Sequence, residues 1–223
     1  MKTNPNRWNS LPGSFDALNA RQILYSDNEW GIPLIRHVSL RAAPEWLAPY
    51  RTRIRSQKAL KGAYHFFLDD FRFESVWNRP HAALRAIQHV PIVLSPDFSL
   101  YRDWPLMLQM WNTYRNRWCG AWWQSQGVTV IPTVSWSTPE SYEFCFAGIE
   151  QNSLVAIGTV GVNFKDSTEK HLFLSGVNEM IKRLQPSLIL CYGPAPPEIE
   201  PNVELITYPT RWKGIRHAWG KKK

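Results

Sequence analysis

The sequence predicts an α/β fold with a mostly parallel sheet and alternating helices, arranged as a TIM-like or incomplete barrel. Short apolar runs recur along the chain, and segments with helical spacing lie between several of them. Many of the runs are apolar at nearly every position, which is typical of strands that helices cover on both faces. Roughly seven strands fall short of the eight of a complete barrel.

Each predicted strand is a run of strand length that is bounded by turn residues. The runs, in chain order, are IPLIRHV from Ile32, YHFFL from Tyr64, PIVL from Pro91, VTVIPTV from Val128, SLVAIGTV from Ser153, SLILCY from Ser187 and VELITY from Val203.

Two segments between the predicted strands have helical spacing. One covers residues 104–126, where large apolar residues recur at intervals of three, four or seven, and the other covers residues 169–184. A stripe of this kind usually faces the core, so we expect it to be buried; its members are Trp104, Leu108, Trp111, Trp118 and Trp122.

The 223 residues, 44% of them hydrophobic, suit one globular domain. We divide it into an N-terminal capping segment with a basic stretch (1–60), an α/β core (61–208) and a basic, Trp-containing tail (209–223). There is no run of about 18 apolar residues and no secretory signal, so we expect no membrane partner. Three cysteines without a CxxC spacing fit a reducing cytoplasm, and we expect the protein to be cytoplasmic.

Most of the net charge of +8 lies in the tail, which carries six basic residues and no acid. Cations interleaved with indoles suit DNA or another nucleic acid, although a solvating extension is the alternative. The tail candidates are Arg211, Trp212, Lys213, Arg216, Trp219, Lys221, Lys222 and Lys223. Further candidates, which either bind phosphate or face water, are Arg51, Arg53, Arg55, Arg115 and Arg117.

Polar or small residues follow five consecutive predicted strands, where parallel α/β folds place their functional groups. The expected site therefore combines carboxylates with hydroxyl and aromatic groups that bind a base or other substrate. The carboxylates are Asp69, Asp70 and Asp97, and the binding candidates are Ser95, Ser135, Trp136, Thr159 and Tyr192.

The carboxylates are the candidate catalytic residues. Asp97 with one aspartate across the mouth suits a base and nucleophile pair, or two or three acids suit Mg²⁺. The alternative is structural, because SPDFS is also a turn-and-cap string in which Asp97 accepts backbone N–H bonds.

The sequence contains no motif for a metal, nucleotide or dinucleotide. HxH, HExxH, GxGxxG and GxxxxGK[ST] are all missing, and His37 and His65 lie inside predicted strands, where histidine is usually a core residue. We expect no metal and no cofactor, with Mg²⁺ only under a nuclease alternative.

Several strings resemble a known family of bacteria, prophages and plasmids that is catalogued as domain of unknown function 4417. They are HFFLDDFRFESVWNRP from His65, VLSPDFSLYRDWPLMLQMWNTYRNRWCGAWWQSQGVTVIPTVSW from Val93, AIGTVGV from Ala156 and LILCYG from Leu188. The resemblance runs from about residue 30 to residue 208. It implies a phage, plasmid or other mobile-element context and no assigned activity or catalytic residue.

The leading hypothesis is a nucleic-acid-acting protein that cleaves the N-glycosidic bond of an extruded DNA base, in the manner of a DNA glycosylase. Trp136 and Tyr192 would sandwich the base. The alternative from another class is a non-enzymatic DNA-binding or replication-accessory protein, and the third is a Mg²⁺-dependent nuclease.

Overall fold

The computed structural model describes Asn19, residues 23–38, Leu40, and residues 42–53, 61–199 and 203–210. Arg55 and Arg211–Lys223, which include all the tail candidates, lie outside the described residues.

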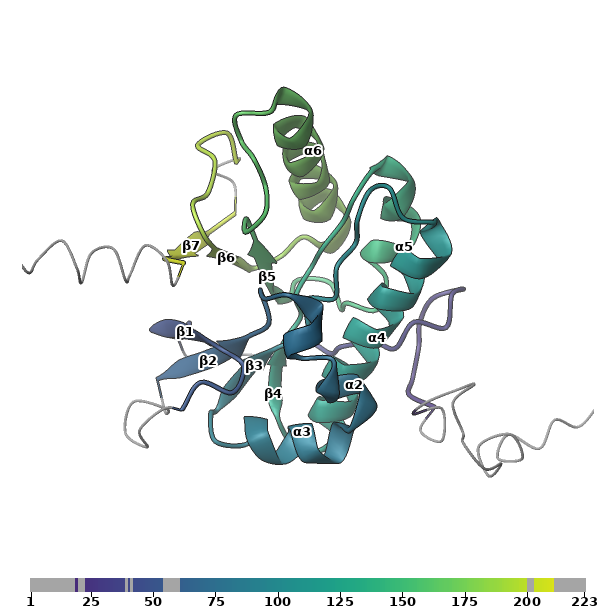
Figure 1. Cartoon of the computed structure of the whole chain (residues 1–223), viewed down its shortest axis with the longest axis vertical. Helices are drawn as coiled ribbons and strands as arrows, with labels where there is room; N and C mark the ends of the chain where they lie inside the picture. Colours follow the sequence, from purple (N-terminus) through teal and green to yellow (C-terminus); the bar gives the residue numbers. More distant parts are fainter. Residues whose placement is uncertain are drawn as a thin grey trace, which may run out of the picture.

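Among the described residues, seven parallel strands follow one another in chain order (Figure 1). The first four form one sheet: β1 (Trp46–Pro49), β2 (Gly62–His65), β3 (Ile92–Leu94) and β4 (Thr129–Ile131). The other three form a second: β5 (Leu154–Gly158), β6 (Leu188–Tyr192) and β7 (Leu205–Tyr208). A parallel bridge between Thr133 and Ala156 joins the two, so the strand order runs unbroken from β1 to β7.

Parallel strands need crossover connections, and helices lie in the four connections that lead from β2 to β6. The first half contains η2 (Asp70–Arg72), α2 (Ser75–Asn78), α3 (Pro80–Ile87) and α4 (Leu106–Ser125), and the second η3 (Pro139–Ser141), α5 (Tyr142–Cys145) and α6 (Ser167–Leu184). The side chain of Asp166 caps α6 by accepting from the N–H groups of Thr168 and Glu169. Pro80 opens α3, where a missing N–H costs nothing.

Alternate strand residues face two different cores, which explains the nearly continuous apolar runs. Val93 and Val130 pack on the side of α2, α3 and α4, and Val155 and Ile189 pack on the side of α6. The residues between them, such as Leu94, Ile131, Leu154, Ala156 and Leu190, form a third cluster on the opposite face. Both faces of the strands are therefore buried.

The sheet is rolled, because residues of distant strands meet on that inner face. The ring of Tyr192 in β6 lies 4.1 Å from the ring of His65 in β2 and stacks on Phe67 at 5.3 Å. The hydroxyl of Tyr208 in β7 donates to the carbonyl of Pro44, just before β1, at 2.6 Å. No strand pairing joins β7 to β1 within the described part of the chain. The mixed α/β fold with parallel sheets and alternating helices is thus confirmed, whereas a closed TIM-like barrel is not.

Two local predictions were wrong, and one strand was not predicted. The run from Ile32 forms only a single bridge, between Ile35 and Ile149, because its other backbone groups bond mostly to side chains, those of Asn28, Gln124 and Glu150. Strand β1 lies inside the predicted capping segment, in a short stretch flanked by prolines that carries no strong strand pattern. The apolar stripe of the long helix is buried only at Trp118 and Trp122; its first half is exposed.

No helix among the described residues is long and apolar enough to cross a membrane.

Candidate functional site

Asp97 and Ser135 meet where β3 and β4 end. Ser95 follows β3 directly and Thr133 follows β4 closely, and Thr133 forms the bridge to Ala156 that links β4 to β5. Just beyond them, the hydroxyl of Ser135 donates a hydrogen bond to the carboxylate of Asp97. The expectation that carboxylate and hydroxyl groups from neighbouring strand ends converge therefore holds for this pair.

The surroundings of Asp97 raise its pKa to about 7. Loss of hydration is the largest cause, and the negative charge of Asp70 acts in the same direction, while the Ser135 bond and the positive charge of Arg117 act against it. The side chain is only half-buried by its exposed area, yet protein atoms surround the carboxyl group closely. The carboxyl group can thus hold or release a proton near neutral pH.

A buried hydrogen-bond network fixes the backbone on both sides of this pair. The hydroxyl of Ser95 donates to Asn116 of α4 at 2.6 Å and accepts from the N–H of Thr133 at 2.8 Å. The hydroxyl of Thr133 donates to the carbonyl of Ser95 at 2.7 Å, and the amide of Asn116 donates to the carbonyl of Thr133 at 3.2 Å. Ser95 has no exposed area, so it acts here on the two strand ends and not on a substrate.

Arg117 is buried to 1% exposure and bonds to backbone carbonyls. Its guanidinium group donates to Thr133 at 2.9 Å, to Cys145 at 2.7 Å and to Ala147 at 3.0 Å. A side chain in this position cannot reach the phosphate of a bound nucleic acid. The structure gives Arg117 a different role, which is to hold the loop after β4 and the end of α5 against α4.

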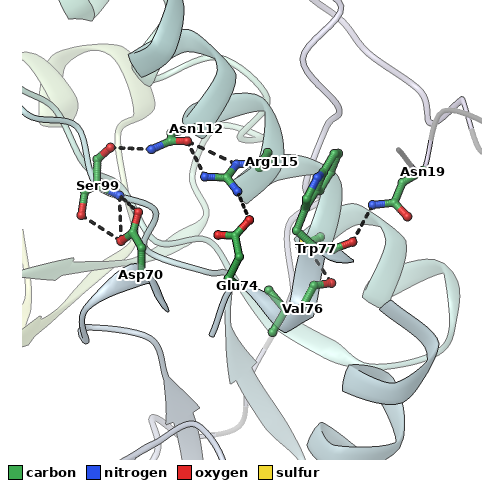
Figure 2. A network of polar contacts seen from close by, with 9 residues as sticks. Asn19, Asp70, Glu74, Val76, Trp77, Ser99, Asn112 and Arg115 are labelled. Carbon is green, nitrogen blue, oxygen red and sulfur yellow. Dashed lines mark hydrogen bonds and ion pairs between the residues drawn. The ribbon is translucent and has the colours of Figure 1, made fainter. Parts of the chain in front are cut away.

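A second network ties the loop after β2 to the loop after β3 (Figure 2). Asp70 accepts from both the N–H and the hydroxyl of Ser99, and the carbonyl of Ser99 accepts from Asn112 of α4 at 2.7 Å. Arg115 donates to Asn112 at 2.6 Å and forms an ion pair with Glu74 at 2.6 Å. Arg115 is therefore engaged inside the protein, and Asp70 positions the loop that carries Asp97.

Sequence reasoning named Arg117 as a phosphate or solvent contact and did not predict that the polar residues of α4 in these networks are buried. The buried polar members are Gln109, Asn112, Thr113, Asn116 and Arg117. They recur at intervals of three and four, so they form a polar stripe on the face of the helix that packs against the strand ends. The three- and four-residue spacing of these polar residues is present in the sequence, but the tryptophans on the same helix gave the stronger pattern.

Trp136, which follows Ser135 in the chain, packs on α6. Its ring lies 5.5 Å from the ring of Phe173 and 6.3 Å from the ring of Phe146. It sits against the backbone at Gly176, where a Cβ would overlap the indole. Trp136 is half-buried and belongs to the core under α6.

Thr159 and Tyr192 are buried at 5% exposure each. The hydroxyl of Thr159 contacts the carbonyl of Tyr192 at 3.4 Å, and the Tyr192 ring fills the inner core beside His65. His65 accepts from the N–H of Phe67, and burial lowers its pKa to about 3, so it is neutral at physiological pH. The part of the predicted mouth at the ends of β5 and β6 is thus filled by packing around these groups.

Among the other candidates, Asp69 is exposed and pairs with Arg72 at 3.1 Å. Arg51 and Arg53 are exposed, and the Arg51 guanidinium lies 5.3 Å from the centre of the Tyr50 ring. These two arginines are the candidate phosphate contacts that the structure describes at the surface.

Two surface hollows open at the amino-terminal ends of the strands, opposite to the ends where Asp97 and Ser135 lie. One, of about 660 Å³, borders the loop before β5 and the end of α6; the other, of about 440 Å³, is lined by the first residues of β5 and β6. Neither is lined by Asp97 or Ser135. In the part of the chain that the structure describes, no three histidine, cysteine or acidic residues gather as metal ligands.

Comparison with known proteins places the chain in a family. The model described as Domain of unknown function (DUF4417) matches residues 24–209. The chain belongs to this family. It is also similar to the "Gene 1 protein" of Mycobacterium phage D29, with 42% identity over 222 residues that cover 96% of this chain and 81% of the relative. The "Gene 1 protein" of Mycobacterium phage L5 is 42% identical over 215 residues, or 95% of this chain and 92% of the relative. No solved structure matches this DUF4417 chain.

Replacing Arg117 by lysine is expected to lower the free energy of unfolding by about 2–4 kcal/mol, because one ammonium group cannot satisfy carbonyls that a planar fork holds at separate positions. Urea unfolding measures the loss. The matched control is Arg85→Lys on the exposed face of α3, which should change stability by less than about 0.5 kcal/mol. Equal stability of the two variants would contradict the structural role of Arg117.

The pH dependence of stability should change when Asp97 is replaced by asparagine. A carboxyl group whose folded pKa is raised stabilises the fold below its unfolded pKa of about 4, and that contribution is lost as the pH rises through about 7. The asparagine side chain would keep an acceptor for Ser135 and lose the charge, so the variant should gain about 1–3 kcal/mol over the wild type between pH 5 and pH 8. Thermal unfolding at both pH values measures this difference. The effect of His65 on stability is the same in both proteins, so it cancels from the comparison. A constant difference would contradict the raised pKa.

Proposed function

We propose that this protein acts on nucleic acid, with the Asp97 carboxyl group as the proton donor or acceptor of the reaction. The observation that carries the proposal is the Asp97–Ser135 pair at the carboxyl edge of the sheet, with a carboxyl pKa near 7. A group that titrates near the working pH is suited to both halves of acid–base catalysis. The similarity to two phage proteins supports a phage context.

The reaction that best fits such a group is hydrolysis of an N-glycosidic bond. Water adds its hydroxyl to C1′ of the sugar, the bond from C1′ to the base breaks, and the base nitrogen gains a proton. Protonated Asp97 supplies that proton and afterwards recovers one from the water. Asp70, whose charge raises the Asp97 pKa, is the second carboxylate that can stabilise the positive charge on the sugar.

Affinity for the phosphate backbone comes from other parts of the chain. Arg51 and Arg53 are exposed, and six further cations follow residue 209 in the sequence. Contacts of this kind are independent of base sequence and release counterions, so they position DNA without choosing the reacting base.

A second candidate is a nucleic-acid-binding protein without catalytic activity. The observation that favours it is that Asp70 is committed to Ser99 and that Asp97 lines neither of the two hollows. In that case the strand-end acids organise loops only. A magnesium nuclease has less support, because the described residues contain no cluster of three metal-ligating side chains.

Incubation of the pure protein with base-modified and unmodified DNA, with and without Mg²⁺, tests the two candidates. We expect release of free base that does not require Mg²⁺, and a decrease of at least about 100-fold for Asp97→Asn, since a positioned acid or base contributes about 10²–10⁴ in rate. Asp69→Asn, which removes an exposed carboxylate, is the matched control and should retain activity. Binding without any product, or equal rates for wild type and Asp97→Asn, would favour the non-catalytic candidate.

Deletion of residues 209–223 should weaken DNA binding and flatten its salt dependence. The six cations removed set an upper limit of about 5 on the decrease in the slope of log K against log salt. Binding titrations between 50 and 300 mM salt measure the slope, with a Lys221–Lys223 deletion as a control of intermediate effect. An unchanged slope would exclude the tail as a nucleic-acid contact.

A further inference from the structure

The beginning of α4 and the loop before it expose an unusual amount of apolar surface. We name this surface the α4 face. Met107 is 72% exposed and Tyr101 55%, and the helix shows no charged side chain in its first two turns. The complete set is Tyr101, Trp104, Leu106, Met107, Leu108 and Trp111. Single exposed apolar residues need no explanation, but six within eleven positions do.

The α4 face continues a stripe that is covered further along the same helix. The ring of Trp118 lies 5.4 Å from Trp77 of α2 and stacks with Trp122, and it is 2% exposed. Trp111 still contacts the edge of Trp77 at 5.3 Å but is 44% exposed. One turn earlier, Met107 is largely exposed. The stripe is thus a helix-packing surface, one half of which α2 covers.

The size of the α4 face suits an interface between two chains. With ordinary side-chain areas, the exposed fractions amount to roughly 600 Å², the upper end for a patch on a monomer and most of the roughly 800 Å² that each partner contributes to a standard interface. This apolar surface does not indicate a membrane-spanning helix, because the other side of α4 packs against the core.

The charge of the α4 face favours a second copy of this chain over nucleic acid. Its loop carries one cation and one anion next to each other, Arg102 and Asp103, so the surface has no net charge for a polyanion to recognise. A neutral surface with adjacent opposite charges is complementary to itself, which a two-fold interface requires. We propose that the protein forms a symmetric dimer through the α4 face, with Arg102 and Asp103 of the two chains facing each other at the rim.

Dimerisation would also restrain the candidate site, independently of what that site does. Tyr101 and Trp104 lie in the connection from Asp97 to α4, and this connection is already tied to Asp70 and Asn112 through Ser99. Burying the two aromatic rings between chains would leave the connection little freedom to move.

Sedimentation analysis of the full chain over a range of concentrations tests the proposal. We expect a species with twice the 25.9 kDa mass of one chain, and Met107→Glu should raise the dissociation constant at least 100-fold. Val160→Glu, which changes an exposed apolar residue outside the α4 face, is the matched control and should leave it unchanged within twofold. Arg102→Asp should weaken the dimer, and the exchange of both charges in Arg102→Asp with Asp103→Arg should restore it. Circular dichroism of each variant confirms folding.

A mass of one chain up to 200 μM would overturn the proposal. A dimer that Met107→Glu leaves intact would also overturn it, since another surface would then be responsible. If the full chain is a monomer and deletion of residues 1–18 produces a dimer, the N-terminal segment is the occupant of the α4 face and the proposal fails. None of these results depends on whether DNA is bound or cleaved.

Discussion

The arrangement of the strand ends depends on polar side chains that α4 buries. Asn112, Asn116 and Arg117 hold the backbone after β3 and β4 with hydrogen bonds whose partners are mostly carbonyl groups. An amide or a guanidinium group removed from water is costly unless its hydrogen bonds are replaced, so a helix of this kind fits one position only. A small shift of α4 would leave several buried groups without partners at once. This requirement fixes where Asp97 and Ser135 lie, more narrowly than apolar packing alone would.

The buried polar side chains of α4 also show which parts of the structure could be predicted from the sequence and which could not. The parallel strands β3 to β7 and the helices α4 and α6 were predictable, because strands buried on both faces are apolar throughout and helices repeat every three to four residues. The meeting of Asp97 and Ser135 followed from strand direction. Whether a polar residue faces solvent, a ligand or the interior depends on the partners that the fold supplies, and for Ser95, Arg117 and Tyr192 those partners are distant in the sequence. The strand β1 was missed because its neighbours, and not its own pattern, place it in the sheet.

The ionised Asp97 carboxylate lowers the stability of the fold, in contrast to the buried hydrogen-bond network beside it. Arg117 favours its ionised form electrostatically, but loss of hydration and the nearby charge of Asp70 outweigh that effect. Arg117 cannot compensate further, because its donors are directed at three carbonyl groups. Ionisation of this carboxyl group is therefore unfavourable, and this cost moves its pKa toward neutral pH. A group with such a pKa can both donate and accept a proton under physiological conditions.

The basic tail and the apolar α4 face differ in the force that would hold a partner on each: electrostatic attraction on the tail and hydrophobic contact on the α4 face. Without the last fifteen residues, 20 basic and 18 acidic groups remain, so the rest of the chain is nearly neutral, and its inner arginines bond to protein atoms. Attraction to a polyanion must then come chiefly from the tail and from a few exposed cations such as Arg51 and Arg53, and it must weaken steeply with salt. Association through the α4 face buries apolar rings and only one opposed pair of charges at the rim, and hydrophobic contacts are not weakened by screening. If the protein binds nucleic acid and dimerises as proposed, salt would therefore release the nucleic acid while leaving the dimer in place, and the two modes of binding could be measured separately on the unmodified chain.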